Sequence, residues 1–138
     1  MTIEEHCIQL GIKREEEYKK FKPVYCPCLK SYVSFNSDGF HHLKYEPSGR
    51  ARTHKEQIYK LNLLPLVVPV IRNAKKVDEY RTEEVRTSRK KNNPKIKKVE
   101  YWSLVEIVGR KCPVKIKVIL WRIGNGNINF RSVMKLTK

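Results

Sequence analysis

Two stretches in the first half of the chain carry apolar residues at helical spacing. In residues 3–20 acidic side chains begin the stretch and lysines end it, which suits a helix dipole, and Pro23 stops it. The second stretch begins with Thr53 and Glu56, which have the three-residue spacing of a capping box. We expect this second helix to continue, kinked by two prolines, to about Ile71.

The segment between these helices has the pattern of short strands and turns. Tyr32–Phe35 is rich in strand-forming side chains, and Asn36–Gly39 is a run of turn-forming residues. We therefore expect Phe40–Tyr45 to form a second strand or a structured loop.

The last third of the chain has the clearest strand pattern. Val99–Val108 is rich in β-branched and aromatic residues, and Val114–Leu120 alternates apolar side chains with lysines. Gly124–Asn127 has the composition of a hairpin turn, so Ile128–Leu136 is expected to return as the next strand. The pattern predicts an α+β fold, with N-terminal helices packed on an antiparallel sheet of about four strands that ends in a meander.

Lysines and arginines dominate residues 74–97. Within this stretch we expect a short helix or strand at Val77–Arg86 and an exposed, mobile loop at Thr87–Lys95. Residues 1–30 are expected to be a helical extension, and residues 31–138 a single domain.

The net charge of the chain limits the classes of function that it can have. Its 138 residues include 30 lysines and arginines against 14 acids, a formal net charge of +16, while 40% of them are hydrophobic. Such a chain can build a core, and its surface favours a polyanionic partner, RNA or DNA ahead of an anionic membrane.

The longest apolar stretch, Leu61–Ile71, is too short and too interrupted to cross a membrane. Since the N-terminus also lacks a secretory signal, we expect a cytoplasmic protein with reduced cysteines.

Basic residues surround the predicted start of the second helix. A helix N-terminus offers free backbone N–H groups and a positive dipole end, so added cations lower helix stability unless an anion is bound among them. This predicts a phosphate pocket, with a solvated basic turn as the alternative. The RNA-contacting candidates here are Arg50, Arg52, His54 and Lys55.

His41 and His42 are candidates for proton transfer, because an imidazole can accept and return a proton near pH 7. On an extended segment these neighbours would point to opposite faces, so one of them would face a site while the other packs or lies in solvent.

The C-terminal meander is strongly basic, with no acid from Arg110 onward. Its cations can hold phosphates, and its interleaved aromatic rings can stack on bases. Alternatively, Trp121 and Phe130 belong to the core. The cations on the predicted strands are Lys115, Lys117, Arg122, Arg131 and Lys135.

The chain has no strong metal or nucleotide motif. Cys26 and Cys28 are too close in sequence to make a good zinc pair, even with the two histidines downstream and Cys112 as a third thiolate. No phosphate-binding loop, dinucleotide-binding glycine pattern or acidic cluster for magnesium is found. We expect no metal and no cofactor, so that a nuclease built on this chain would be metal-independent.

Several segments, taken together, resemble phage-type nucleases of the Barnase–EndoU–Colicin–RelE superfamily over roughly residues 32–136. The first block of the resemblance comprises Phe40–Tyr45, Arg50–Ile58 and Leu61–Pro65, and the second comprises Tyr101–Leu104, Lys115–Val118 with Gly124–Gly126, and Phe130–Val133. The resemblance implies helices packed on a four-stranded antiparallel sheet. It also implies metal-independent RNA cleavage, of tRNA or rRNA for example, by a toxin that an antitoxin protein inhibits.

By position, the resemblance implies a catalytic set drawn from His41 or His42, Lys55, Arg122 and Ser132. Arg131 stands where the family would have an aromatic residue before the serine, which suggests a phosphate contact in place of stacking. In the implied mechanism the RNA 2′-hydroxyl attacks phosphorus, giving a 2′,3′-cyclic phosphate and a 5′-hydroxyl, while cations stabilise the phosphoryl oxygens.

Strand alternation sets Arg131 and Ser132 on opposite sides of their strand, so only one of them would enter a given pocket. Ile128, Phe130 and Met134 would share the side of Ser132, which ordinarily marks that side as core. The resemblance favours Ser132, with Arg131 as the alternative.

Two other functions are compatible with the same residues. One is a non-catalytic RNA- or ribosome-binding protein that uses the basic sheet, and the other is a metal-dependent DNA nuclease that uses His41 and His42. Cleavage of RNA in EDTA separates the three, whereas salt-sensitive binding does not.

Overall fold

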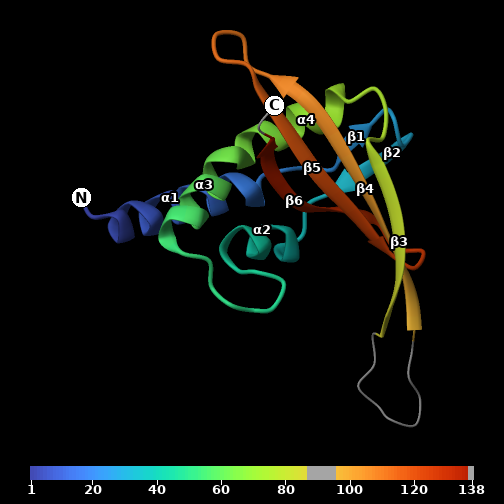
Figure 1. Cartoon of the computed structure of the whole chain (residues 1–138), viewed down its shortest axis with the longest axis horizontal. Coiled ribbons are helices and arrows are strands. Elements are labelled where there is room, and N and C mark those ends of the chain that lie inside the picture. Colours follow the sequence, from blue (N-terminus) through green and yellow to red (C-terminus); the bar gives the residue numbers. More distant parts are fainter. Residues whose placement is uncertain (87–95, 137–138) are drawn as a thin grey trace.

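The computed structural model describes residues 1–86 and 96–136, which form an α+β fold with a six-stranded sheet (Figure 1). The elements are α1 (Ile3–Lys19), β1 (Val24–Cys26), β2 (Ser31–Ser34), α2 (Ser37–Lys44), α3 (His54–Leu63), the 3-10 turn η1 (Leu64–Leu66), α4 (Val67–Asn73), β3 (Glu79–Arg86), β4 (Ile96–Val108), β5 (Val114–Ile123) and β6 (Ile128–Leu136). The predicted loop at Thr87–Lys95 lies outside the described residues.

The strand order β1-β2-β6-β5-β4-β3 corrects the expected sheet. Strands β4 to β6 form an antiparallel meander, as the sequence predicts, and β3 extends it at the segment for which the sequence predicts a short helix or strand. However, β2 joins β6 in parallel, with Val33 opposite Ile128, and β1 extends the sheet beyond β2. The sheet is therefore mixed and has six strands rather than about four. Strand β2 lies where the sequence predicts a strand, at Tyr32–Phe35, but its parallel pairing with β6 joins distant parts of the chain. Strand β1, which pairs with β2, has only three residues and little local signal.

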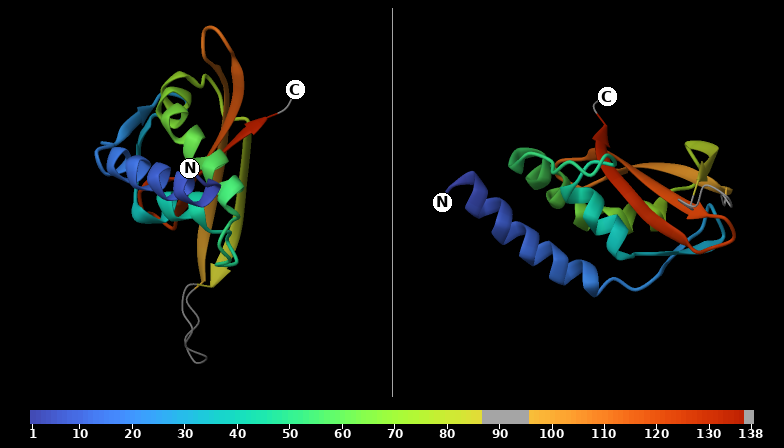
Figure 2. Two further views of the ribbon diagram at one scale, coloured as in Figure 1. Left: turned by 90° about the vertical axis from the view of Figure 1, so that its left-hand side faces the viewer. Right: turned by 90° about the horizontal axis from the view of Figure 1, so that it is seen from below.

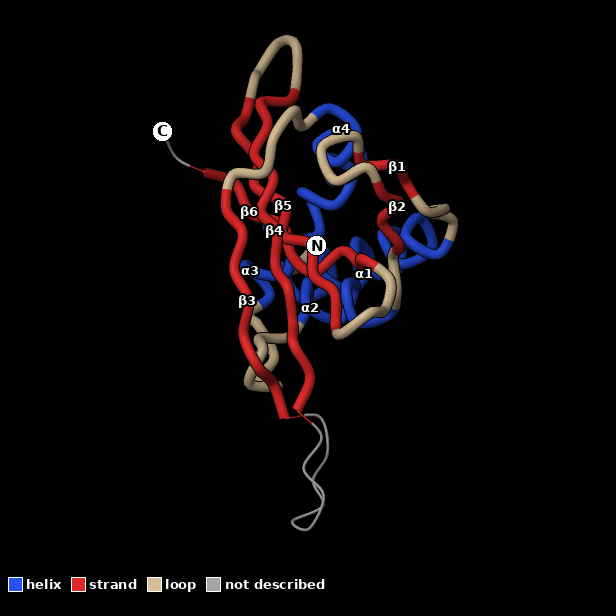
Figure 3. The backbone as a smooth tube through the Cα atoms, turned by 90° about the vertical axis from the view of Figure 1, so that its right-hand side faces the viewer, coloured by secondary structure: helices blue, strands red, loops and turns tan. Residues whose placement is uncertain are grey.

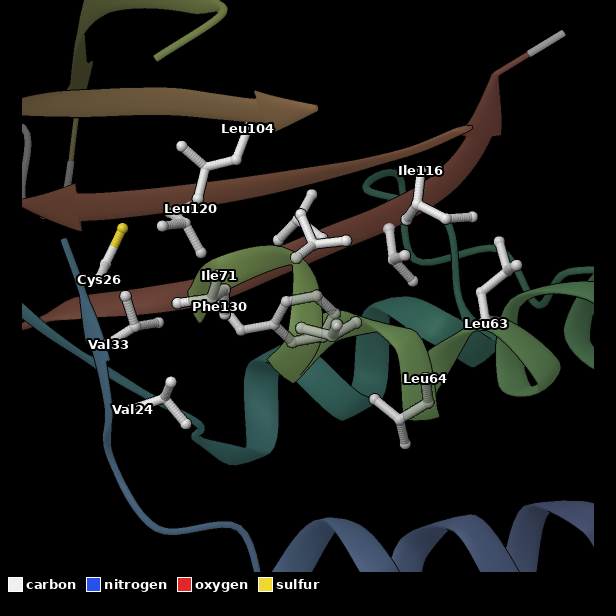
Figure 4. Packing of buried hydrophobic residues seen from close by; sticks show 14 of the residues in the cluster. Val24, Cys26, Val33, Leu63, Leu64, Ile71, Leu104, Ile116, Leu120 and Phe130 are labelled. Carbon is white, nitrogen blue, oxygen red and sulfur yellow. The ribbon is translucent and has the colours of Figure 1, made fainter. Parts of the chain in front are cut away.

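The helices lie on one face of the β3–β6 meander (Figure 2). Helix α4 contacts β1 near one end of the sheet as well as β4 and β5 near the other, so the sheet curves around it (Figure 3). Fully buried side chains from both layers meet in this space, among them Phe130, Leu64, Ile71, Leu104 and Leu120 (Figure 4). We call the opposite side of the meander the outer face.

Residues 1–30, expected as an extension, contribute to this same core. Leu10 and Tyr18 of α1 and Val24 and Cys26 of β1 are buried in it. Thr2 caps α1 by accepting a hydrogen bond from the Glu5 amide.

The expectation of a turn at Asn36–Gly39 followed by a strand or structured loop at Phe40–Tyr45 is wrong, because Ser37–Lys44 forms helix α2. The side chain of Asn36 caps the helix by accepting a hydrogen bond from the Gly39 amide at 3.2 Å. A Cβ on Gly39 would lie 2.6 Å from the Tyr18 hydroxyl and 2.8 Å from the Phe130 carbonyl oxygen. Gly39 therefore has a packing role, because the absence of a Cβ allows α2 to approach β6 closely. The sequence alone indicates only a turn residue at this position.

Helix α3 has the predicted cap, since the Thr53 hydroxyl accepts a hydrogen bond from the Glu56 amide. The predicted kinked continuation is also confirmed. Pro65 is the second residue of η1, Pro69 lies in the first turn of α4, and the helical path ends at Asn73.

Helix α3 also covers an edge of the sheet. Strand β2 pairs with β6 only as far as Asn129, which leaves the second half of β6 without a strand on that side. There Lys60 donates a hydrogen bond to the Val133 carbonyl at 2.7 Å, and the Tyr59 hydroxyl accepts one from the Lys135 amide at 2.8 Å.

No helix within residues 1–86 and 96–136 is long and apolar enough to cross a membrane.

Candidate active site

Helix α2 carries both histidines and turns their rings in different directions. His41 is exposed and stacks on Tyr45, with ring centroids 4.3 Å apart and planes at 15°. His42 is half-buried, and its ring centroid is 6.4 Å from that of His41. Successive helical residues differ by about 100° around the axis, so the two rings serve neighbouring surfaces rather than the opposite faces of a strand.

A β-bulge changes the direction in which the candidate residues of β6 point. Ile119 pairs with Ser132 and Leu120 pairs with Phe130, so Arg131 is an extra residue in β6. Phe130 and Val133 are fully buried, whereas Ser132 follows Ile119 to the outer face.

The Arg131 side chain also reaches the outer face, where its guanidinium carbon lies 4.3 Å from the centroid of the Trp121 ring. Arg131 and Ser132 are therefore available on the same side, contrary to the expectation from simple alternation. For the same reason Ser132 does not share its side with Ile128 and Phe130, which face the core.

Four basic side chains gather where α2 and α3 meet β6. We call Arg52, His42, Lys60 and Arg131 the basic cluster. Arg52 Nε donates a hydrogen bond of 3.0 Å to the His42 carbonyl, and Lys60 is anchored to the Val133 carbonyl of β6. Arg131 and Arg52 both act electrostatically on His42, and Arg52 acts on Lys60.

The environment of the cluster opposes positive charge. Burial, followed by the positive charges of Arg131, His41 and Arg52, lowers the pKa of His42 to about 4, while the Asp38 carboxylate acts in the opposite direction. The imidazole is consequently neutral at neutral pH and able to accept a proton.

Lys60 and Arg131 are affected in the same way. Burial, followed by the charge of Arg52, lowers the pKa of Lys60 to about 8. Burial also lowers the pKa of Arg131. Within the described ranges, no carboxylate lies within ion-pair distance of Arg52, Lys60 or Arg131. A bound anion would relieve this excess of positive charge.

The other sequence candidates are not all at this cluster. His54 and Lys55 are exposed in the first turn of α3, and Arg50, three residues before the cap, forms a 3.5 Å ion pair with Glu46. Lys115 is exposed on β5, and Lys117 lies 4.0 Å from Glu79.

Arg122 is separated from Ser132 by the sheet. Alternation along β5 places Arg122 on the helix-facing side with Leu120, whereas Ser132 pairs with Ile119 on the outer face. Arg122 donates to Glu100 Oε1 from Nε at 3.0 Å and from Nη2 at 2.6 Å. Its guanidinium is thus used in an ion pair, away from the cluster.

The outer face carries a row of stacked cations and rings across four neighbouring strands. The guanidinium carbon of Arg81 lies 4.1 Å from the Tyr101 ring centroid, the Tyr101 and Trp121 rings stack with centroids 6.2 Å apart, and Arg131 covers Trp121. Trp121 is therefore only half-buried on the outer face, whereas Phe130 belongs to the core.

Sequence reasoning missed Lys60. This lysine stands three residues after Gln57 and four before Leu64, on the side of α3 that faces β6, and helical spacing could have marked it as a half-buried cation. The sulfur atoms of Cys26 and Cys28 lie 3.5 Å apart. Over the residues that the structure describes, no three His, Cys, Asp or Glu side chains converge as a metal site would require.

Comparison with known proteins assigns no family. No protein-family model matches the chain, and neither curated proteins nor solved structures gave a match. The functional argument therefore rests on the residues of this chain.

Proposed function

We propose that the protein is a metal-independent endoribonuclease whose active site is the basic cluster. The observation that carries this proposal is a neutral, half-buried imidazole, His42, among cations that have no carboxylate partner in the described structure. Such a site combines a proton acceptor with an anion-binding environment, and RNA cleavage through the 2′-hydroxyl needs both.

In this proposal His42 removes the proton from the 2′-hydroxyl as its oxygen attacks the adjacent phosphorus. A bound phosphate raises the pKa of His42, because an opposite charge favours the protonated ring. Arg131 and Arg52 stabilise the negative charge on the phosphoryl oxygens, and Ser132 orients the phosphate. Lys60, a stronger acid than an ordinary lysine, gives a proton to the leaving 5′-oxygen. The products are a 2′,3′-cyclic phosphate and a 5′-hydroxyl.

The proposal retains the other expectations from the sequence. The substrate is a structured cellular RNA such as tRNA or rRNA in the cytoplasm, and a protein antitoxin is the expected inhibitor. Lys55, Arg50, His54, Lys115 and Lys117 are then phosphate contacts outside the reacting centre. An α+β fold with helices on an antiparallel meander supports the resemblance to the Barnase–EndoU–Colicin–RelE superfamily, and we propose membership on that basis.

The test is incubation of the purified chain with tRNA and rRNA in EDTA, with identification of the new ends. We expect cyclic phosphate ends and a loss of about 10²–10⁴-fold in rate for His42→Ala. His41→Ala is the matched control and should retain a rate within about tenfold of wild type, since its ring faces Tyr45. Circular dichroism would confirm that both variants fold. Equal rates for wild type and His42→Ala would contradict the assignment of His42.

The same assay decides between the alternatives. The row of Arg81, Tyr101, Trp121 and Arg131 favours a non-catalytic RNA-binding protein as the second candidate, because rings and guanidinium groups on a sheet can hold RNA without cutting it. Intact RNA after long incubation would support that function. Activity that EDTA abolishes would instead support a metal-dependent nuclease.

A further inference from the structure

A hollow of about 590 Å³ lies between the second half of α1, the end of β2 and helix α2. Its volume falls within the range of about 300–1,000 Å³ typical of small-ligand sites. Six rings contribute to its lining: Tyr18, Phe21, Phe35, Phe40, His41 and Tyr45.

The rings form a floor and a rim. Tyr18 and Phe40 are buried with centroids 5.4 Å apart, and the Tyr18 hydroxyl is fixed by a 2.6 Å hydrogen bond to the Asn36 carbonyl. At the rim, the stacked pair of His41 and Tyr45 presents a flat aromatic edge. The space is therefore bordered by fixed rings, which suits a planar guest.

Polar groups also line the hollow and limit the chemistry of that guest. Lys19 and Lys44 both line the hollow. Lys19 forms a 3.4 Å ion pair with Glu15, whereas the Lys44 ammonium lies 6.0 Å from the Phe40 centroid and is the cation available to an anion. Glu15 and Ser37 offer hydrogen-bonding groups. A planar ring that carries hydrogen-bonding edges and is attached to an anion matches this lining, as a nucleobase with its phosphate does.

The hollow and the basic cluster are adjacent, because neighbouring residues of α2 serve the two. His41 lines the hollow, while His42, with its ring centroid 6.4 Å away, belongs to the cluster. A single strand of RNA with its phosphate at the cluster could therefore place a neighbouring base in the hollow.

We propose that this hollow binds one unpaired base of the RNA, next to the phosphate held by the basic cluster. The proposal rests on the proposed ribonuclease function and adds a base-binding subsite to it. The subsite would give the enzyme its preference for single-stranded segments, since a base within a duplex could not enter.

The test measures binding separately from cleavage. The probe is a short single-stranded RNA in which every 2′-hydroxyl is methylated, so that it cannot be cut, with a second series that lacks one base at each position in turn. For the wild-type chain we expect one missing base to weaken binding about tenfold.

Tyr45 provides the variants for this test. Tyr45→Ala should weaken binding of the complete probe and become insensitive to the missing base, whereas Tyr45→Trp, which keeps a ring, should retain both properties. Tyr32→Ala is the matched control, because Tyr32 is an exposed ring in edge contact with Tyr25 and does not line the hollow, and it should behave as wild type.

Equal binding of all probes by the wild-type chain would overturn the subsite, even if the chain cuts RNA. The subsite would also be overturned if Tyr45→Ala still lost as much affinity as the wild type when one base is missing from the probe. If N-acetyltryptophanamide occupies the hollow and the probes do not, the guest is a protein side chain and the proposal is wrong. A chain that passes the binding test but never cleaves unmodified RNA would contradict the proposed function and leave the subsite standing.

Discussion

The guanidinium of Arg52 donates a 3.0 Å hydrogen bond from Nε to the backbone carbonyl of His42. The Arg52 backbone amide also donates a hydrogen bond to the Lys44 carbonyl, so Arg52 satisfies two backbone carbonyls at the C-terminal end of α2. The segment that connects α2 to α3 is thereby held against α2, the helix that carries His42, the proposed general base. Arg52 is both a structural residue and a cation of the site, whereas its sequence context indicates only a phosphate ligand.

Replacing Arg52 should therefore affect folding as well as RNA binding. Arg52→Ala removes the hydrogen bond to the helix end, and we expect a loss of about 1–2 kcal/mol in the free energy of unfolding. Lys55→Ala, at an exposed site without a structural contact in the described part, should weaken RNA binding and change stability by less than about 0.5 kcal/mol. Urea unfolding of both variants checks this. A wild-type midpoint for Arg52→Ala would mean that Arg52 serves the ligand alone.

The pKa of His42 predicts how stability responds to pH. The folded value of about 4 lies below the ordinary value of 6.5, so the unfolded chain binds the proton more readily, and stability falls as the pH drops from about 6.5 toward 4. Between pH 7.5 and 5.0 we expect His42 to account for a loss of about 1 kcal/mol, a value reduced for solvent screening of a half-exposed ring.

Urea unfolding of wild type and His42→Gln at the two pH values measures this contribution. The variant should lose less stability on acidification than the wild type does. His41→Gln serves as the control and should follow the wild type. Parallel losses in wild type and His42→Gln would show that His42 titrates normally.

Gly39 and Gly11 form a matched pair for the packing of α2. Gly39→Ala would bring a methyl group to 2.6 Å from the Tyr18 hydroxyl and 2.8 Å from the Phe130 carbonyl oxygen, so we expect a loss of about 1–3 kcal/mol. At Gly11 the nearest atoms would be 3.8 Å away, at the end of the Lys44 side chain. Gly11→Ala should therefore stabilise α1 by up to about 1 kcal/mol.

Thermal unfolding distinguishes these two outcomes. An equal or higher melting temperature for Gly39→Ala would show that α2 can move away from β6 at little cost.

Arg122 provides a test of the site's boundary. Because Arg122 is paired with Glu100, away from the basic cluster, Arg122→Ala should lower stability by about 1 kcal/mol. Its rate of RNA cleavage should stay within about twofold of wild type, as should that of Glu100→Gln, which breaks the same pair. Single-turnover cleavage by the three proteins is the measurement. A loss of a hundredfold or more in folded Arg122→Ala, with Glu100→Gln unaffected, would place Arg122 at the substrate.

Elements with local signals were predictable from the sequence. The cap of α3 depends on Thr53 and Glu56, the kink on Pro65 and Pro69, and the boundaries of β6 on the hairpin turn before it. Each of these signals lies within a few residues of the structure that it specifies.

The remaining features depend on distant contacts. Asn36 can begin either a turn or a helix, and the contact of α2 with β6 favours the helix. No characteristic residue marks the bulge at Arg131 in the sequence. It is visible only in the structure, where Val133 is buried although simple alternation from Phe130 would place it on the outer face. As a result, His42 and Arg131 were predictable as candidates, while their meeting at one edge of the sheet, and the part of Lys60 in it, were not.

The coverage of β6 by α3 also bears on association with other chains. An uncovered strand edge offers backbone groups on which a further strand can add, and this is a common route to aggregation. Lys60 and Tyr59 engage two of these groups, at Val133 and Lys135. Addition of a strand from another protein is thereby directed to the two ends of the sheet, at β1 or at β3 with its charged residues. A lysine of the proposed reacting centre thus also keeps that centre from being capped by another protein's strand.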